Sequence, residues 1–337
     1  MKSFILGLFV LVIAPGISSC SKNPVSGTVV SKRVEVGPGP EDMVLDTLHS
    51  PRLLISCTAR RESQKPYGEI EAVDLGTGIR TVLFRHGEPS GLRFRPHGIC
   101  LDGALLYVIS HETEPDYHPI LIYRVHRDSL EFLELVHTQL LHSPNALVTG
   151  PRGEIYVVND SGKRGSLAEK ILRLRRASVV KLVKGADGEW ESEFMALELG
   201  YPAGINRIGS KLYVGDAILH RIHVFQISNP GLAPVTQIRG LKGNDNIRIY
   251  NDMILTPGHI KPFRFISHTK DPGNLSPVEV FMVNPKTGEI NSLFRTDGSM
   301  ISGGSTAIIY DNVLYISQVF DPFILEVELD PSLSLVK

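Results

Sequence analysis

The chain contains little of several features that mark particular protein classes. It has three cysteines in 337 residues, and two of them, Cys57 and Cys100, lie in apolar strand patterns, which favours buried free thiols over a disulfide. Basic residues number 35 and acidic residues 36, so the formal net charge is −1 and nothing favours a nucleic-acid partner. No stretch differs enough in composition to be a linker, and residues 20–337 are therefore read as one domain.

The sequence also has no long apolar run at its start. The N-terminal run covers only residues 4–14, which is too short to cross a bilayer, and it is typical of a signal peptide over residues 1–19. The small residues before Cys20 resemble the bacterial lipobox, in which the cysteine is lipidated; plain secretion with cleavage near Ser19 is the alternative. Ser21 favours, by the same resemblance, the outer membrane. We therefore expect a lipid-anchored protein of the bacterial cell envelope that faces the periplasm or the exterior.

A strand opening of one kind is present six times. The openings recur every 43 to 58 residues, and each is followed by alternating or continuous apolar runs. They begin at Pro40, Pro96, Pro144, Pro202, Asp245 and Gly303. A period of roughly 40–50 residues with several strands per unit is typical of propeller blades. The sequence predicts an all-β, six-bladed β-propeller, with residues 27–36 supplying the outer strand of the last blade.

One segment departs from the strand pattern. Ser166 and Glu169 form a capping box, and Leu167, Ile171 and Leu174 share a helical face. A short helix is predicted over residues 166–176, and it is basic because of Lys170, Arg173, Arg175 and Arg176. This helix is either an ordinary solvated helix packed on a loop, or a helix near the tunnel mouth that contacts an anionic membrane surface or covers the site.

The strand openings carry oxygen ligands. Equivalent positions in the blades converge on one axis, so Glu41, Asn145, Asp245 and Asn246 are expected to meet there. Calcium binds six to eight oxygen atoms from carboxylates, amides, carbonyls and water. Each of these residues alone could instead satisfy the backbone amides of a turn. Four of them at one phase of the repeat favour a calcium site with positions left for water or substrate.

Two histidines suggest a reaction at this site. His97 occupies the same phase in the second blade, and His111 lies in the next strand, which can return beside it. An imidazole titrates near pH 6.5, so one ring can take a proton from water while the second orients and polarises that ring. A calcium ion acting as a Lewis acid on a carbonyl would complete the chemistry of ester or lactone hydrolysis. His259 is a further candidate at the tunnel mouth.

These motifs together resemble the paraoxonase/arylesterase family in order and spacing. The residues that carry the resemblance are Glu41-Asp42-Met43-Val44, Pro96-His97-Gly98-Ile99, Pro144-Asn145, Gly204-Ile205-Asn206, Asp245-Asn246-Ile247 and Gly303-Gly304-Ser305-Thr306. The resemblance implies a six-bladed propeller with two calcium ions in its tunnel. It also implies lactonase and arylesterase activity on small-molecule substrates.

The resemblance further implies a role for each of these residues. Glu41, Asn145, Asp245 and Asn246 would bind a catalytic calcium ion, and His97 with His111 would form a catalytic dyad. Asp42 and the carbonyl of Ile99 would bind a second, structural calcium ion.

Two positions depart from the family pattern. Ala203 stands where the family has an asparagine ligand of the catalytic calcium, and a water molecule could complete that site. Ala146 stands where it has an aspartate of the structural site, so we expect one calcium ion rather than two. Asn206 is expected to lie behind the ligands rather than to replace the missing asparagine.

Two other functions remain open at this point. The chain could be a gluconolactonase-like or strictosidine-synthase-like propeller enzyme, or a surface-anchored binding propeller that has no catalytic activity. Substrate specificity is expected in the loops over residues 112–119, 159–176 and 258–277, because propellers carry their specificity in the loops at one end of the tunnel.

Overall fold

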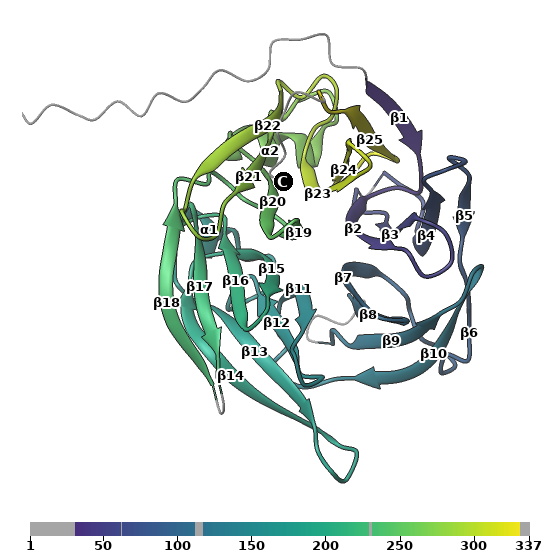
Figure 1. Ribbon diagram of the computed structural model, residues 1–337, viewed down its shortest axis with the longest axis vertical. Coiled ribbons are helices and arrows are strands. Elements are labelled where there is room, and N and C mark those ends of the chain that lie inside the picture. Colours follow the sequence, from purple (N-terminus) through teal and green to yellow (C-terminus); the bar gives the residue numbers. More distant parts are fainter. Residues whose placement is uncertain (1–30, 62, 112–116, 229–230, 331–337) are drawn as a thin grey trace, which may run out of the picture.

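The strands of the chain form six sheets around a central axis. The computed structural model describes residues 31–330 except 62, 112–116 and 229–230. In this part of the chain, one edge strand of each sheet lies nearest the axis (Figure 1). The predicted six-bladed β-propeller is therefore confirmed. The signal peptide of residues 1–19 and the lipidation of Cys20 lie outside the described residues and stay predictions.

The first three blades follow each other along the chain. The first contains β2 (Pro40–Asp46), β3 (Arg52–Thr58), β4 (Gly68–Asp74) and β5 (Arg80–Val82). The second contains β7 (Pro96–Asp102), β8 (Leu105–Ser110), β9 (Ile120–Val125) and β10 (Ser129–Val136), with β6 (Phe84–His86) parallel to β10 at its outer edge. The third contains β11 (Pro144–Thr149), β12 (Ile155–Asn159), β13 (Ala177–Lys184) and β14 (Trp190–Leu199).

The last three blades repeat this pattern. The fourth contains β15 (Pro202–Ile208), β16 (Lys211–Asp216), β17 (Arg221–Ile227) and β18 (Leu232–Arg239). The fifth contains β19 (Arg248–Tyr250), β20 (Met253–Gly258), β21 (Val278–Val283) and β22 (Ile290–Thr296). The sixth contains β23 (Gly304–Tyr310), β24 (Val313–Gln318), β25 (Phe323–Glu328) and, from the start of the chain, β1 (Ser31–Glu35).

The first described strand closes the ring. β1 pairs antiparallel with β25, with Ser31 opposite Val327 and Glu35 opposite Phe323. An outer strand from the N-terminal segment was predicted for the last blade, and this pairing confirms it. The sixth blade is thus assembled from segments far apart in the sequence, and β1 forms its outer edge strand.

The apolar core lies between the blades rather than in one central mass. The buried hydrophobic side chains of the described residues form six clusters, and each cluster joins two neighbouring blades. Cys57 lies in the cluster between the first and sixth blades, and Cys100 is partly buried against its neighbours. Both are free thiols, as predicted.

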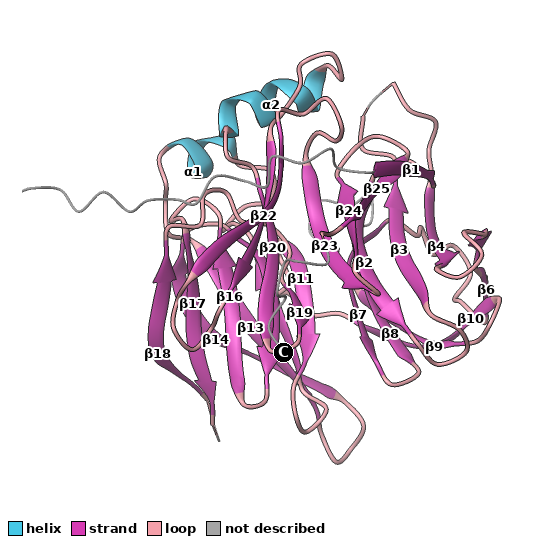
Figure 2. Ribbon diagram, turned by 45° about the horizontal axis from the view of Figure 1, so that its top comes forward, coloured by secondary structure: helices cyan, strands magenta, loops and turns pink. Residues whose placement is uncertain are grey.

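Two helices lie on one face of the propeller (Figure 2). α1 (Leu167–Ile171) begins as predicted, because the Ser166 hydroxyl accepts a hydrogen bond from the Glu169 amide at 3.3 Å. The predicted helix was too long, since Arg173 has a φ of 51° and the helix ends before it. α2 (Pro262–Lys270) was not predicted, and it lies in a segment that was expected to be a loop.

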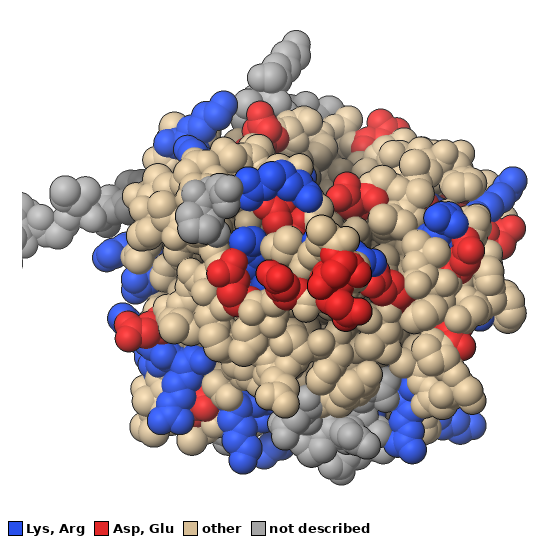
Figure 3. Space-filling view, turned by 90° about the horizontal axis from the view of Figure 1, so that it is seen from below, with Lys and Arg blue, Asp and Glu red and all other residues tan. Residues whose placement is uncertain are grey.

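Charged side chains of both signs are scattered over the side of the propeller seen in Figure 3, with carboxylates in a band across the middle of the view. In the third blade, Lys181 of β13 pairs with Glu193 of β14 at 2.8 Å. Among the described residues, no helix is long and apolar enough to cross a membrane.

Neighbouring inner strands approach so closely that they exclude a side chain at Gly98. A Cβ atom there would lie 2.2 Å from the carbonyl oxygen of Asn145 and 2.9 Å from the Cα of Ala146. We expect Gly98→Ala to reduce the free energy of unfolding by about 2 kcal/mol, because the second and third blades would have to move apart. Thermal melting of the purified protein measures this change.

Gly76→Ala is the matched control. A Cβ atom at Gly76, which is exposed, would have only the Asp74 carboxylate nearby, at 3.5 Å. This variant should change the unfolding free energy by less than about 0.5 kcal/mol. Equal melting temperatures for the two variants would contradict a constraint at Gly98.

Candidate functional site

The inner strands begin with a β-bulge at the positions singled out in the sequence. The register between inner and second strand shifts between Pro40 and Asp42, between Pro96 and Ile99, and between Pro144 and Ala146. The residues at these shifts are Glu41, His97 and Asn145; corresponding shifts in the fourth and sixth blades contain Ala203 and Ser305. A bulge leaves a residue outside the ladder and re-aims its side chain. The bulges therefore explain how one repeated position supplies the tunnel with polar groups.

A cavity of about 300 Å³ opens at the helix-bearing end of the tunnel. Its lining includes Gly165, which lies just before α1, and Phe265 and Thr269 of α2. Six residues discussed from the sequence line it: Glu41, His97, Asn145, Ala203, Asp245 and His259. The structure thus brings together predicted site residues from four of the six blades, with Ala203 from a further blade beside them.

Glu41 and Asp245 are linked through Ser305. The Ser305 hydroxyl lies 3.3 Å from Glu41 Oε1 and 3.1 Å from Asp245 Oδ2. The side-chain amide of Asn246 donates toward Ser305 at 3.2 Å and toward Glu41 at 3.5 Å. His259 Nε2 contacts Asp245 Oδ2 at 3.0 Å. Two buried carboxylates therefore share one polar network at the bottom of the cavity.

Three oxygen atoms of this site are buried without a hydrogen-bond partner in the described structure: Glu41 Oε2, Asn145 Oδ1 and Asn246 Oδ1. The amide nitrogen of Asn145 donates to Asp160 at 3.4 Å, which leaves its oxygen available. Buried polar atoms are rarely unpaired, and such atoms commonly mark an ion or water site. Carboxylate and amide oxygens are the ligands that calcium prefers, so these residues fit that ion.

The donor set is a mixed one. Within the described residues, no group of three or more histidine, cysteine, aspartate or glutamate side chains could hold a metal ion. Glu41 and Asp245 supply carboxylates, while Asn145 and Asn246 supply neutral amides. This composition suits calcium, which accepts amide and carbonyl oxygens, better than zinc, which is bound mostly by cysteine and histidine.

Burial strongly affects the ionisation of Glu41. Burial is the main cause that raises the pKa of Glu41 to about 8, and the negative charges of Asp42 and Asp245 add to it. The guanidinium of Arg60, whose Nη2 lies 3.6 Å from Glu41 Oε2, acts in the opposite direction. In the absence of a bound metal ion, the Glu41 carboxyl group therefore holds a proton near neutral pH.

His97 and His111 lie side by side, as predicted from the strand order. Their ring centroids are 4.6 Å apart, and both rings are buried. Burial is the main reason that the pKa of each is well below its usual value, and nearby Arg164 lowers both further. Both nitrogens of His97 lack a hydrogen-bond partner in the described structure. At neutral pH both rings are therefore neutral, and His97 has a nitrogen free to accept a proton.

Arg164 and His118 both contact the ring of His111. Nη1 of Arg164 lies 2.8 Å from Nδ1 and 2.7 Å from Nε2 of that ring. His118 packs edge-on against it, with ring centroids 5.0 Å apart. These contacts hold His111 in place beside His97.

Asp42 and Ile99, which were expected to bind the second, structural calcium ion, also lie together; their place in the tunnel is called the inner position, and the calcium site of Glu41 is called the outer site. At the inner position the guanidinium of Arg248 lies between the two residues. The Asp42 carboxylate accepts a hydrogen bond from the Ile99 amide at 2.8 Å. Arg248 contacts both the Asp42 carboxylate and the Ile99 carbonyl oxygen. Asn206, as expected, does not replace the missing asparagine; its side chain lines a different pocket and donates to the Ile247 carbonyl at 3.0 Å.

Comparison with protein families agrees with this geometry. The arylesterase family model matches residues 64–326. The chain belongs to the arylesterase family. Its relatives include canine serum paraoxonase/arylesterase 2, which is 27% identical over 247 residues, and human serum paraoxonase/lactonase 3, which is 24% identical over 241 residues. Each alignment covers 67% of this chain and 67% of the relative.

Solved structures with the same fold are more distant in sequence. A gluconolactonase from Xanthomonas campestris superimposes with a TM-score of 0.58 at 14% identity, covering 90% of this chain and 91% of that one. A luciferin-regenerating enzyme gives a TM-score of 0.56 at 10% identity, with 89% and 95% covered. Likeness at this level supports the propeller fold alone.

Several cavity residues of this arylesterase-family chain were not predicted from its sequence. Arg60, Asp160, Arg164 and Tyr201 all line the cavity. Asp160 directly follows β12, and an acidic residue at the end of a predicted strand is a pattern that indicates a candidate site residue. The two arginines gave none, because an arginine in a loop is usually solvated.

The raised pKa of Glu41 predicts how calcium binding depends on pH. Calcium must displace the proton that Glu41 holds below about pH 8. We expect calcium to bind more tightly as the pH rises from 6 to 8, by up to about tenfold per pH unit, and to release about one proton per ion at pH 7.

Calorimetry in buffers of different ionisation enthalpy measures that proton release. Glu41→Gln is the matched control, because it keeps the size of the side chain and cannot hold the proton. It should bind calcium more weakly and with little pH dependence. An unchanged pH dependence in this variant would show that another group is responsible.

Proposed function

We propose that this arylesterase-family propeller is a calcium-dependent hydrolase of lactones or aryl esters. The observation that carries the proposal is the set of three buried oxygens from Glu41, Asn145 and Asn246 that have no hydrogen-bond partner in the described structure. They come from different blades, and Glu41 lies beside His97, the first of two adjacent neutral histidines. Family membership supports a lactonase- or esterase-type hydrolase. The calcium ion and the roles of the individual residues belong to the proposal.

Glu41, Asn145, Asp245 and Asn246 would hold the ion. Calcium bound there would supply the positive charge that polarises a substrate carbonyl and stabilises negative charge developing on its oxygen. Ala203, which is buried and lines the cavity, leaves one ligand position to water or substrate.

His97 would act as the base. It lines the cavity, its ring is neutral at pH 7, and neither of its nitrogens has a hydrogen-bond partner in the described structure, the nearest carboxylate contact being that of Nε2 with Glu41 Oε1 at 3.7 Å. His97 can therefore take the proton of an attacking water molecule. His111 would orient His97 and share the positive charge that follows. Arg164, which lines the same cavity, restrains the His111 ring through the contacts described above.

An aromatic wall would receive the substrate's carbon skeleton. Phe265 of α2 stacks on His259 with ring centroids 3.8 Å apart, and Phe265 also lies near Phe320. All three rings line the cavity. An acyl chain or an aryl leaving group can contact this wall while its carbonyl group faces the carboxylates.

Hydrolysis of a panel of small lactones and aryl esters tests the proposal. We expect activity with calcium, loss of activity on chelation, and recovery when calcium is returned. Asp245→Ala should reduce kcat/KM at least about 100-fold, because it removes a carboxylate of the metal site. Asp102→Ala is the matched control, since its exposed carboxylate lies at the opposite end of the tunnel, and it should keep full activity. Full activity of Asp245→Ala would exclude the proposed calcium role.

A second variant separates metal binding from proton transfer. His97→Gln should retain calcium binding and lose turnover. Sugar-lactone hydrolysis without aryl-ester hydrolysis would favour a gluconolactonase-like enzyme instead. Calcium binding without turnover of any substrate would favour a binding propeller.

We also propose that the protein lies at the membrane of a bacterial cell envelope, anchored by lipid on Cys20. Exposed apolar side chains beside basic ones support contact between the helix-bearing face and a membrane: Ile171 is 63% exposed, Leu172 66% and Phe263 82%. Arg173, Arg175 and Arg176 are also exposed. Such a combination favours the surface of an anionic membrane.

Vesicle sedimentation tests this contact on the domain that begins after Cys20. We expect binding to anionic vesicles, weaker binding to neutral ones, and a loss of binding when Ile171 and Leu172 are both changed to Asn. Val235→Asn is the matched control, because Val235 is 51% exposed on β18. Equally poor binding to both kinds of vesicle would contradict the proposed contact.

A further inference from the structure

The inner position of the tunnel has its polar groups fully engaged. The Asp42 side chain is 1% exposed. Its Oδ1 accepts hydrogen bonds from the Met43 amide and the Thr306 hydroxyl, each at 2.8 Å, and its Oδ2 accepts one from the Ile99 amide at 2.8 Å. The carboxylate is therefore held rigidly, and its negative charge requires a partner.

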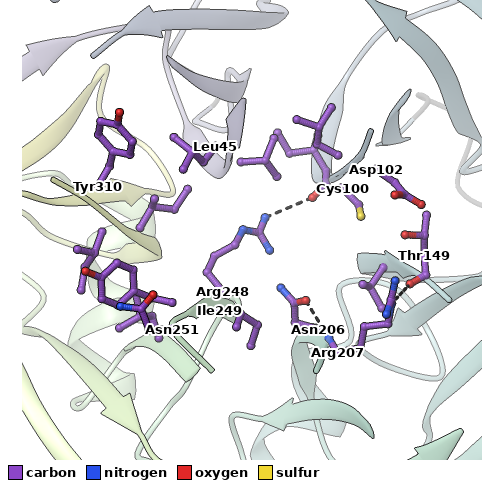
Figure 4. A pocket seen from close by; sticks show the side chains of 18 of the residues that line it. Leu45, Cys100, Asp102, Thr149, Asn206, Arg207, Arg248, Ile249, Asn251 and Tyr310 are labelled. Atoms are coloured by element: carbon purple, nitrogen blue, oxygen red, sulfur yellow. Dashed lines mark hydrogen bonds between the residues drawn. The ribbon is translucent and has the colours of Figure 1, made fainter. Parts of the chain in front are cut away.

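That partner is Arg248, the first residue of β19. Its Nη2 lies 2.5 Å from Asp42 Oδ1 and 3.3 Å from the Ile99 carbonyl oxygen. Its Nε donates to the Met43 carbonyl at 2.7 Å and its Nη1 to the Ile247 carbonyl at 3.0 Å. Figure 4 shows the side chain reaching across the pocket from Ile249 toward Cys100, which is the neighbour of Ile99. One guanidinium thus meets four oxygen atoms.

We propose that the Arg248 guanidinium takes the place of a metal ion at the inner position, so that the propeller binds calcium only at its outer site. Asp42 and the Ile99 carbonyl are the two groups that the family resemblance assigns to a structural calcium ion. Here both are occupied by a cation of the chain itself. These residues therefore do not fit a second calcium ion, and the single-site part of the proposal rests on the proposed function.

The charges of the inner set favour an arginine over calcium. Asp42 is the carboxylate among the four acceptors that Arg248 contacts, and the other three are backbone carbonyls. A guanidinium leaves this buried set neutral, whereas a divalent ion would leave it with one excess positive charge. Ala146 contributes no second carboxylate. The planar guanidinium also presents several N–H groups in fixed directions, which suits several acceptors at once.

At the outer site, which Glu41 lines, the neighbouring arginine does not occupy the oxygen atoms. Arg60 lies near Glu41, but its Nε and Nη2 form no hydrogen bond in the described structure, and Glu41 Oε2 has none either. Arg60 therefore contributes charge without occupying the ligand atoms. The oxygens at the inner position therefore have hydrogen-bond partners, whereas Glu41, Asn145 and Asn246 at the outer site each have an oxygen without one in the described structure.

Counting bound calcium tests the proposal directly. Equilibrium dialysis against calcium should give one ion per chain for the wild type and none for Asp245→Ala, because that variant loses the outer site. Two ions in the wild type, or one that persists in Asp245→Ala, would overturn the proposal. No ion in either protein would contradict the proposed function while leaving the inner position without a metal, as inferred.

A second experiment recreates a metal site at the inner position. In the Asp245→Ala background, Arg248→Ser should lower the melting temperature by roughly 5–10 °C, because it leaves the buried Asp42 charge unpaired. Adding Ala146→Asp should make the melting temperature rise with millimolar calcium and yield one bound ion. Absence of any calcium response would overturn the idea that Arg248 replaces a metal ion.

Arg207→Ser is the matched control for this series. Arg207 lines the same pocket and its side chain donates to the Thr149 carbonyl at 2.7 Å and to the Gly209 carbonyl at 3.2 Å, so the acceptors of its guanidinium are backbone carbonyls rather than a carboxylate. Its replacement should leave the melting temperature nearly unchanged and independent of calcium. If Arg248→Ser is too unstable to purify, the calcium counts in the wild type and Asp245→Ala still decide the proposal.

Discussion

Two adjacent carboxylates, Glu41 and Asp42, lie buried beside the axis of the propeller, and the structure around them depends on how each charge is balanced. A buried carboxylate without a partner costs several kcal/mol, so its surroundings must supply charge or hydrogen bonds. For Asp42, Arg248 from the fifth blade completes that balance. Glu41 has no such partner: Arg60 stays 3.6 Å away, one oxygen has no hydrogen-bond partner in the described structure, and burial raises the pKa of the group to about 8, so a proton takes the place of a balancing cation. The capacity to bind something new therefore belongs to the end of the tunnel that holds Glu41.

A repeated distortion of the strands determines which side chains reach that end. The same bulge occurs where the inner strands of five blades begin, and the residue placed there differs from blade to blade. Glu41 and Asn145 contribute oxygens, His97 contributes a base, and Ser305 links the carboxylates. Ala203 contributes no polar group. These five blades have the same backbone distortion, and they differ in the side chain that they contribute, because a different residue occupies that one position in each.

This division explains what the sequence could predict. The blades, the ring closure and the meeting of Glu41, His97, Asn145 and Asp245 followed from strand patterns and from one repeated phase, which are local properties. Arginines were the main omission, because their long side chains reach into the tunnel from positions outside that phase. Arg248 follows the predicted opening by one residue, yet only the folded chain brings it to Asp42, 206 residues away. Helix α2 was missed for a similar reason, since its position depends on the packing of Phe265 and His268 against Phe320.

The pairing of β1 with β25 has a consequence for the order of folding. Because Ser31 lies opposite Val327, the ring stays open until almost the whole chain has been synthesised. Glu41 and Asp245 come from the first and fifth blades, and the sixth blade, which carries Ser305, must stand between them before their network exists. Contacts between residues so far apart in sequence form slowly, because a long loop must close first. A nascent chain therefore has most of its hydrophobic core before it has a binding site, and any ligand of that site acts on an already folded ring.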